Sequence, residues 1–267
     1  MTLVNLGCGR RIHPAWQNLD LTASVPGVIE HDLRRGLPFA DNTCEAVYHS
    51  HVLEHLEPEE GRGLIAECFR VLRPGGVLRV VVPDLEGITK QYLASLDAAD
   101  SEQAAKADHE WMTVELLDQM VRTRSGGRMR RYFDDAHLAN RPFIVSRLGS
   151  EVTGEPAMAG SKTLATRVKR SLSRLQRTAA LAAATLVGGK QGYRDLKEVF
   201  FRRSGEVHRW MYDRVSLARL LAEAGFGRIA RRTAFESAIP KFASYELDTT
   251  SDQVRKPDSL FMEGVKS

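Results

Sequence analysis

Residues 4–10 read VNLGCGR, a short apolar run that leads directly into a Gly-x-Gly turn. Because glycine has no Cβ and adopts positive φ at little cost, Gly7 and Gly9 allow the backbone to approach a ligand closely. Two acidic residues follow, Asp20 in the sequence NLDL and Asp32 in HDL. A carboxylate at the end of a second strand can bind a ribose diol, and a polar residue at the end of a third strand can reach an adenine. This ordered set predicts a nucleoside cofactor site.

The composition is that of an ordinary globular protein, since 43% of the 267 residues are hydrophobic and 27% are charged. The length suits one α/β domain of about 150–200 residues with an insertion or a tail. Cys8, Cys44 and Cys68 lie far apart and form no CxxC pair, which argues against a disulfide scaffold or a structural zinc site. The first residues lead into a predicted strand without a signal-peptide pattern, so we expect a cytoplasmic protein.

The net charge of +4 comes from one segment of the chain. Between residues 157 and 190 there are seven cations and no acidic residue, and without these cations the net charge would be −3. A nucleic-acid-binding domain would carry a basic face on its fold, so we expect no nucleic-acid partner.

The same segment predicts an amphipathic helix. Apolar residues recur at helical spacing from Leu164 to Leu175, arginines lie on the opposite face, and residues 179–187 add an apolar tail. The apolar run is too short to cross a bilayer, but a basic amphipathic helix can lie on an anionic membrane surface. Residues 162–189 are therefore a candidate for peripheral contact with the inner face of a membrane. The alternative is a helical lid or a dimer contact whose basic face is solvated.

The first third of the chain alternates strands with helices or short connections. Strands are predicted at residues 2–6, 17–21, 27–31, 44–50 and 77–82, and a helix at 59–71. The helix is stopped by RPGG at 73–76, because proline cannot continue it and glycine supplies the turn. The strand at 77–82 is nearly unbroken valine and leucine, which is typical of a central strand buried on both faces. This alternation predicts a parallel sheet with helices on both faces.

The alternation stops after the fifth strand and resumes near Val207. Between them we predict helices at 86–98 and 101–122 and an irregular stretch at 133–160. Asp213 is a good N-cap for a helix at 214–224, and strands follow near 228–235 and 259–265. We therefore divide the chain into three parts. Residues 1–90 form the cofactor-binding half, 91–204 a helical or irregular insertion (a lid, substrate or membrane-contact element), and 205–267 the C-terminal part of the same domain.

These residues resemble the class I S-adenosylmethionine-dependent methyltransferases of the small-molecule, type 11 kind. The matching pieces are residues 4–9, Asp20, Asp32-Leu33, SHVLEH at 50–55, ECFRVLRPGG at 67–76 and PDSLFMEG at 257–264. The resemblance implies a Rossmann-like, doubly wound α/β fold, with a seven-stranded, mostly parallel sheet and a helical insertion after strand five. Asn5 stands where the family has an acidic residue, and Arg11 stands where its loop has a third glycine.

The resemblance also implies the cofactor S-adenosylmethionine and the residues that bind it. We expect the cofactor-binding set to be Asn5, Gly7, Gly9, Asp20, Asp32, Leu33, His49 and Ser50. Asp20 would accept hydrogen bonds from the ribose diol, and Asp32 would lie near the adenine. His49 and Ser50 would line the methionine end, because ligands sit outside the carboxyl ends of parallel strands.

His51, Glu54 and His55 have i, i+3, i+4 spacing, which puts all three side chains on one face of a helix. Two histidines and a glutamate could bind a metal ion, but the resemblance implies none and the sequence shows no further ligand, so we expect no metal site. His51 or His55 could act as a general base, since imidazole titrates near neutral pH. The alternative is structural: Glu54 caps the following loop and His55 is half-buried.

A second cluster, EVHRWMYD at residues 206–213, precedes the predicted helix at 214–224. His208 could face the transferred methyl group from the opposite wall, as a third candidate base. Trp210 and Tyr212 would then shape an apolar pocket, or they belong to the core.

The resulting functional hypothesis is methyl transfer from S-adenosylmethionine to an oxygen or nitrogen of a small-molecule or glycan acceptor. A base is needed only where the acceptor holds its proton tightly, and His51, His55 and His208 are the candidates. One alternative is a nicotinamide-dependent oxidoreductase, although the turn lacks the third glycine of the dinucleotide fingerprint. The other is a non-catalytic relative that binds a partner through the insertion.

Overall fold

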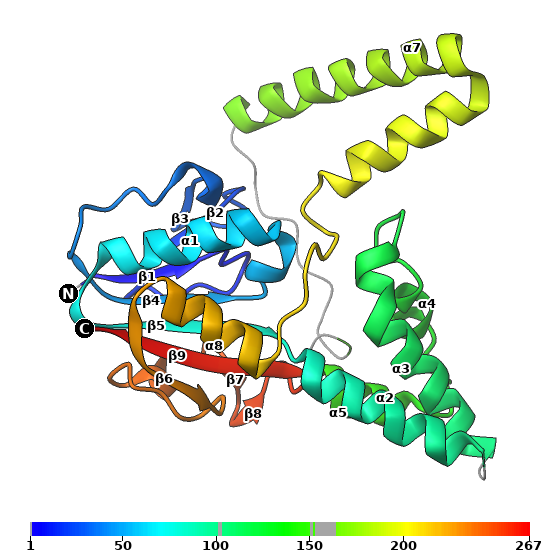
Figure 1. The fold of residues 1–267 in the computed structure, drawn as a ribbon. Helices are drawn as coiled ribbons and strands as arrows, with labels where there is room; N and C mark the ends of the chain where they lie inside the picture. The colour runs from blue at the N-terminus through cyan, green and yellow to red at the C-terminus, as the bar shows by residue number, and fades with distance from the viewer. Residues whose placement is uncertain (1, 101–102, 150–151, 153–163) are drawn as a thin grey trace.

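The computed structural model describes residues 2–100, 103–149, 152 and 164–267, and its centre is a seven-stranded sheet (Figure 1). The strand order is β3-β2-β1-β4-β5-β9-β6. In sequence order the strands are β1 (Leu3–Leu6), β2 (Gln17–Asp20), β3 (Val28–Glu30), β4 (Cys44–Ser50), β5 (Leu72–Pro83), β6 (Phe226–Arg232) and β9 (Ser259–Lys266). Neighbours from β3 to β5 are parallel, and β9 runs antiparallel to both β5 and β6. The predicted mostly parallel α/β sheet is confirmed.

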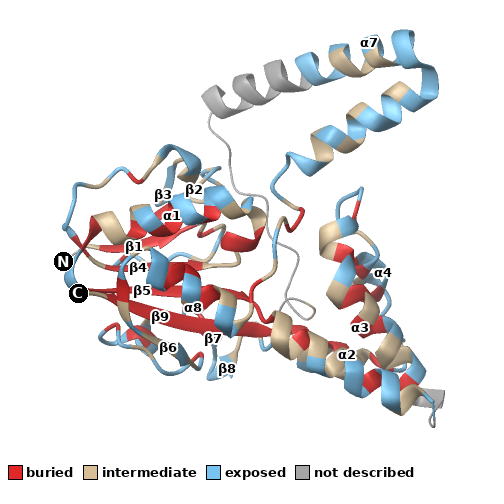
Figure 2. Ribbon diagram, in the orientation of Figure 1, coloured by how far each residue is buried: buried red, intermediate tan, exposed pale blue. Residues whose placement is uncertain are grey.

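One face of the sheet is covered by helices α1 (Pro58–Val71) and α8 (Arg214–Glu223) (Figure 2). In α1, Leu64, Ile65 and Cys68 recur at helical spacing and are at most 2% exposed. Proline at the first position and a reciprocal Glu57–Glu60 capping box start this helix. These residues pack on β1, β4 and β5 to form the main core.

Among the described residues, no α-helix covers the other face of the sheet, contrary to our expectation. Trp16 and Tyr48 pack there with a C-terminal segment that includes the short 3-10 helix η3 (Phe242–Tyr245) and the hairpin of β7 (Thr249–Thr250) and β8 (Gln253–Val254). The connection from β1 to β2 covers only residues 7–16 and contains a proline, so it has no room for a packed helix. An aromatic cluster takes the place of that helix.

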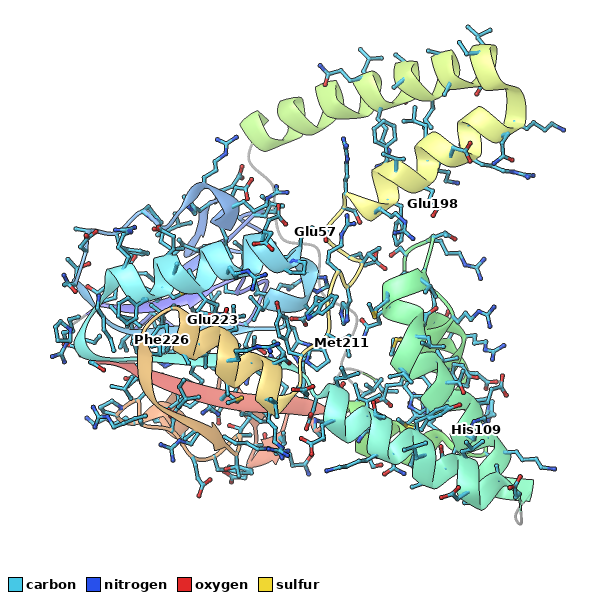
Figure 3. All side chains as sticks on the ribbon, in the orientation of Figure 1. Glu57, His109, Glu198, Met211, Glu223 and Phe226 are labelled. Atoms are coloured by element: carbon cyan, nitrogen blue, oxygen red, sulfur yellow. The ribbon has the colours of Figure 1, made fainter. Side chains whose placement is uncertain are left out.

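After β5 the chain forms a helical insertion with a core of its own. Its helices are α2 (Leu85–Ala99), α3 (Gln103–Val121), α4 (Met129–Asp134) and α5 (Arg141–Leu148). Trp111 and Met112 are fully buried there, and Met211, in the segment before α8, packs against the same cluster (Figure 3).

The expectation of an irregular stretch at 133–160 is wrong for its first half. Residues 141–148 are helical because Ile144 and Leu148, one turn apart, are both buried in this core. Such a short helix depends on tertiary burial, which local sequence does not reveal. Residues 150–151 and 153–160 of that stretch, like residues 101–102 of the helix predicted at 101–122, lie outside the described residues.

The long helix α7 (Leu164–Arg202) carries the basic segment. It is two helices joined at Gly189, whose φ of 60° breaks the helical path, and the two arms approach each other where the Arg177 guanidinium lies 4.9 Å from the centre of the Phe200 ring. Leu186 and Val187 are 88% and 93% exposed. Among the described residues, no helix is long and apolar enough to cross a membrane. Membrane contact through residues 162–189, the first two of which lie outside the described residues, stays a prediction.

Asp213 caps α8 as predicted, and its replacement by alanine is expected to lower the free energy of unfolding by about 1 kcal/mol at neutral pH. Its side chain accepts hydrogen bonds of 2.8 Å from the N–H groups of Val215 and Ser216. These bonds, above all the one from Ser216, lower the pKa of the Asp213 carboxyl. A carboxyl whose pKa is lowered by folding stabilises the fold above its unfolded pKa of about 3.9. That contribution is lost as the pH falls through the lower folded pKa.

The measurement is urea unfolding of wild type and Asp213→Ala between about pH 7 and pH 2, where the difference should shrink below about pH 4. Asp213→Asn is the matched control, since asparagine keeps a capping oxygen without the charge. A difference between wild type and Asp213→Ala that stays constant with pH would contradict the assignment.

Candidate functional site

A cavity of about 420 Å³ opens where β1, β2 and β4 end. Its lining includes six of the predicted site residues: Gly7, Asp20, Asp32, Leu33, His51 and His55. Ligands of open α/β sheets bind at this edge, where the strand order reverses between β1 and β4. The structure thus brings together residues that the sequence distributes over about fifty positions.

Asp20 anchors the glycine turn. Gly7 and Gly9 have φ values of 60° and 54°, the left-handed region that glycine adopts most easily. The N–H of Gly9 donates to Asp20 Oδ2 at 2.9 Å, and the N–H of Thr22 donates to Oδ1 at 3.0 Å. A carboxylate has about four lone-pair sites, so two donors leave acceptor capacity for a ligand hydroxyl.

Asp32 follows β3 and begins the 3-10 helix η1 (Leu33–Arg35). Its carboxylate accepts two hydrogen bonds of 2.9 Å from the Arg34 guanidinium, which lowers its pKa. This pair sits at the rim of the cavity, with the guanidinium about half exposed. Asp32 is therefore held ionised and oriented beside the cavity.

Four residues of the expected cofactor-binding set do not line the cavity: Asn5, Gly9, His49 and Ser50. Asn5 is buried under the turn, where its amide donates to the Arg11 carbonyl and to Asn18 Oδ1. His49 is fully buried, and burial lowers its pKa to about 4. Asn5 stabilises the turn from below, a role that its position in a strand sequence does not distinguish from ligand binding.

A second cavity of about 310 Å³ shares two lining residues, His51 and His55, with the first. On its far side the insertion contributes charged and apolar side chains, and the segments before α8 and β9 contribute the rest. The lining comprises Gln119, Arg122, Gly126, Met129, Phe133, Leu148, Glu206, His208, Lys256 and Asp258 in addition to the two histidines. The histidines that follow β4 thus form a wall between two cavities.

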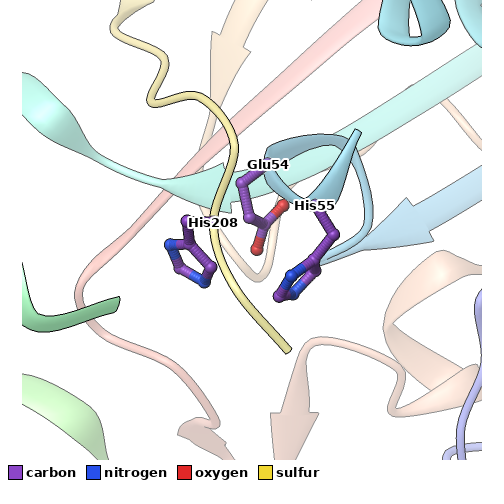
Figure 4. A group of neighbouring side chains, drawn as sticks. All are labelled: Glu54, His55 and His208. Carbon is purple, nitrogen blue, oxygen red and sulfur yellow. The ribbon is translucent and has the colours of Figure 1, made fainter. Parts of the chain in front are cut away.

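His208 meets this wall because backbone hydrogen bonds hold its segment there. The N–H groups of Arg209 and Trp210 donate to the Glu54 carbonyl at 2.6 and 3.2 Å, and the N–H of His208 donates to the Gln119 carbonyl at 3.0 Å. The His55 and His208 rings pack edge to face with their centres 4.8 Å apart. Figure 4 shows the Glu54 carboxylate between the two imidazoles.

The charges of this group are set by burial and by each other. Burial raises the pKa of the Glu54 carboxyl, but the neighbouring imidazoles, led by His51, outweigh it and lower the pKa to about 2. Burial lowers the pKa of His208 to about 3. At neutral pH the group therefore holds a carboxylate beside a neutral imidazole.

His51 is the most constrained of the three predicted bases. It has a φ of 55°, which is rare for a residue other than glycine and is a form of strain found at functional sites. Its Nδ1 lies 3.1 Å from Glu54 Oε1, and its Nε2 lies 2.9 Å from the Ser259 hydroxyl oxygen. A carboxylate behind Nδ1 favours the tautomer in which Nε2 accepts a proton.

Trp210 and Tyr212 line neither of these two cavities but a separate one of about 160 Å³, and of the two alternatives left open from the sequence the core placement holds for Tyr212. Tyr212 is 4% exposed in the main core, and the Trp210 side chain is 47% exposed beside α1 and α8. Sequence reasoning gave no site role to Val52, Glu206 and Asp258, although each lies in a motif quoted above, and it missed Arg122 and Lys256, which no quoted motif contains.

Residues 11–80 match a family model described as a methyltransferase domain. A probable S-adenosylmethionine-dependent methyltransferase of Mycolicibacterium smegmatis is 42% identical over 57 residues, which are 20% of this chain and 21% of that protein. An uncharacterized protein of Saccharomyces cerevisiae is 31% identical over 103 residues, 39% of this chain and 11% of that protein. The chain thus spans only 11% and 21% of the length of these relatives.

Among solved structures, one from Thermotoga maritima is described as an S-adenosylmethionine-dependent methyltransferase and a possible histamine N-methyltransferase. It is 11% identical, and the alignment covers 100% of this chain and 82% of that chain with a TM-score of 0.39. The family model, in contrast, falls on the segment that carries Asp20, Asp32 and the two wall histidines. This match and the seven-stranded sheet confirm that the chain resembles the class I S-adenosylmethionine-dependent methyltransferases.

Proposed function

We propose that the chain binds S-adenosylmethionine in the first cavity and catalyses transfer of its methyl group to an acceptor in the second. One observation carries this proposal: the two cavities share the wall formed by His51 and His55. Cavities that share lining residues adjoin, so a donor bound in one and an acceptor bound in the other can come into contact and be aligned for in-line displacement, which is the main requirement of this reaction. The cofactor, when bound, supplies an electrophilic methyl carbon on a sulfonium.

The residues of the chain have separate tasks in this scheme. Asp20 accepts hydrogen bonds from the ribose, and Gly7 lets the backbone approach the ligand. His51 Nε2, oriented by Glu54 behind Nδ1, exchanges its contact with the Ser259 hydroxyl for the acceptor and takes the acceptor's proton as the acceptor oxygen or nitrogen bonds to the methyl carbon. The carbon–sulfur bond breaks, and its electron pair stays on sulfur. His208 is the weakest of the three candidate bases, because its pKa of about 3 is far from neutral.

For the acceptor we propose a small molecule or part of a glycan with a hydroxyl or amine group. The second cavity has the size of a small-molecule site, and its lining carries both acidic and basic side chains beside Met129 and Phe133. Such a mixed lining supports a polar, hydrogen-bonding acceptor better than a nucleic-acid backbone, which calls for a continuous basic surface.

The test is calorimetric titration of the protein with S-adenosylhomocysteine. Asp20→Ala should weaken binding by roughly 10- to 100-fold, the equivalent of losing one or two charge-assisted hydrogen bonds. Glu30→Ala is the matched control: Glu30 pairs with Asp20 in the register of β2 and β3 but does not line the cavity, so its loss should leave affinity unchanged.

Asp20→Asn removes the charge but keeps one side-chain oxygen, which can accept from either the Gly9 or the Thr22 N–H group, so it retains part of the support of the turn. NADH, titrated in parallel, should not bind. Equal affinity of wild type and Asp20→Ala would remove the assignment. Binding of NADH in place of S-adenosylhomocysteine would favour an oxidoreductase, and cofactor binding without transfer to any acceptor would favour the partner-binding alternative.

A further inference from the structure

The Glu54 carboxylate is buried beside His51, yet within the described part of the chain neither of its oxygens accepts a well-aligned hydrogen bond. The residue is 0% exposed. His51 Nδ1 lies 3.1 Å from Oε1 but is poorly aligned with it. An ionised carboxylate removed from water is costly unless it is paired or binds a metal ion.

Two imidazoles complete a set of ligand atoms around this carboxylate. One atom each from Glu54, His55 and His208 lie within 4.8 Å of one another. Nδ1 of His55 lies 3.3 Å from the Val207 carbonyl, which leaves Nε2 of that ring available as a ligand. His208 is 4% exposed, and its Nδ1 has no hydrogen-bond partner among the described residues.

We infer that Glu54, His55 and His208 form a binding site for a divalent transition-metal cation of the Zn²⁺ type, contrary to our expectation from the sequence that there is no metal site. Two imidazoles and one carboxylate are a common ligand set of zinc sites that keep an open coordination position. Mg²⁺ and Ca²⁺ prefer oxygen ligands and are poor fits to this set. Ligands about 2.1 Å from a metal lie at most about 4.2 Å apart, so binding requires a small inward movement.

The position of the site indicates how its occupant would act. His55 lines both cavities and His208 lines the second, so the open coordination position faces the space proposed for the acceptor. A bound cation would lower the pKa of an acceptor hydroxyl and hold its oxygen in place. This role rests on the proposed function, whereas the binding of the cation does not.

The test is equilibrium dialysis and calorimetry of the chelator-treated full chain with Zn²⁺ alone, with bound metal quantified by elemental analysis. We expect close to one Zn²⁺ per chain, not displaced by excess Mg²⁺. Glu54→Gln and His208→Ala should each weaken binding by more than about 100-fold, since loss of mere supporting residues already reduces metal affinity by 10- to 100-fold. His137→Ala, which removes an exposed histidine outside the cluster, should bind as wild type does.

Glu54 and His208 are buried, so their replacement can disturb folding. His55→Ala is a second ligand variant at a half-buried position, where the substitution disturbs the fold less. Co²⁺ bound to the wild type should show the strong visible absorption of a low-coordinate site, and His55→Ala, which loses one of the two imidazole ligands, should show it weakened or lost. Wild type without stoichiometric Zn²⁺, or Glu54→Gln with unchanged affinity, would overturn the inference. S-adenosylhomocysteine affinity measured in the same samples keeps this result distinct from failure of the proposed cofactor site.

Discussion

Replacing Arg79 with methionine is expected to lower the free energy of unfolding by about 3–5 kcal/mol. Arg79 lies in the middle of β5 and is 0% exposed. Its guanidinium donates to Asp248 Oδ2 at 2.8 Å and to Glu263 Oε1 at 2.9 Å, and it lies 4.5 Å from the centre of the Phe242 ring. Removing it would take away the buried cation that Asp248 and Glu263 share and leave Glu263 with the partly exposed Arg232, and the poorly compensated burial of the two carboxylates causes the loss.

The measurement is urea unfolding of Arg79→Met beside the matched variant Arg232→Met. Arg232 pairs with the other oxygen of Glu263 at 3.2 Å, but its side chain is 36% exposed, so its loss should amount to less than about 1 kcal/mol. If Arg79→Met and Arg232→Met lose similar amounts of unfolding free energy, burial is not the reason why Arg79 stabilises the fold.

Gly7→Ala is expected to destabilise the fold by about 2–4 kcal/mol and to distort the cofactor cavity. A Cβ at this position would lie 2.3 Å from Cγ2 of Val52, far inside van der Waals contact, and the φ of 60° disfavours any side chain. The strain would act where the turn meets the wall after β4, so affinity for S-adenosylhomocysteine should fall together with stability.

Gly9→Ala is the matched control, because Gly9 has a similar φ but a Cβ there would meet nothing within 4 Å. The unfolding free energy of Gly9→Ala should therefore fall only by the cost of holding alanine at a positive φ, about 1–2 kcal/mol. In the double variant Gly7→Ala/Val52→Ala the colliding methyl is gone and the Val52 Cβ is at an ordinary 3.5 Å, so part of the stability should return. If the change in unfolding free energy of the double variant equals the sum of the two single changes, the collision with Val52 is not the cause.

Local patterns predicted the parts of the fold that depend on local physics. The apolar run at 77–82 became the middle of β5, and Asp213 caps α8 because its capping signal lies within four residues. The turn and the following carboxylates met in one cavity, since consecutive parallel strands end at the same sheet edge.

Contacts between distant segments could not be predicted from the sequence. His208 joins Glu54 and His55 only because the Glu54 carbonyl accepts hydrogen bonds from the segment after His208. Arg79 interrupts an apolar run, and the neighbouring sequence does not indicate that its ion-pair partners lie in the C-terminal part of the chain. Ile144 and Leu148 form a helix for the same reason, since the core that buries them comes from α2 and α3.

The position of β9 between β5 and β6 has a consequence for biosynthesis. A ribosome completes β5 early but reaches β9 only after the whole insertion, α8 and β6 have been made. At about 5–20 residues per second, this interval lasts roughly 10–35 s. Throughout it, the nascent chain exposes a strand edge rich in valine, which is open to pairing with other chains. Aggregation during translation should therefore depend on how fast the ribosome passes the insertion, and slow codons there would lengthen the exposure.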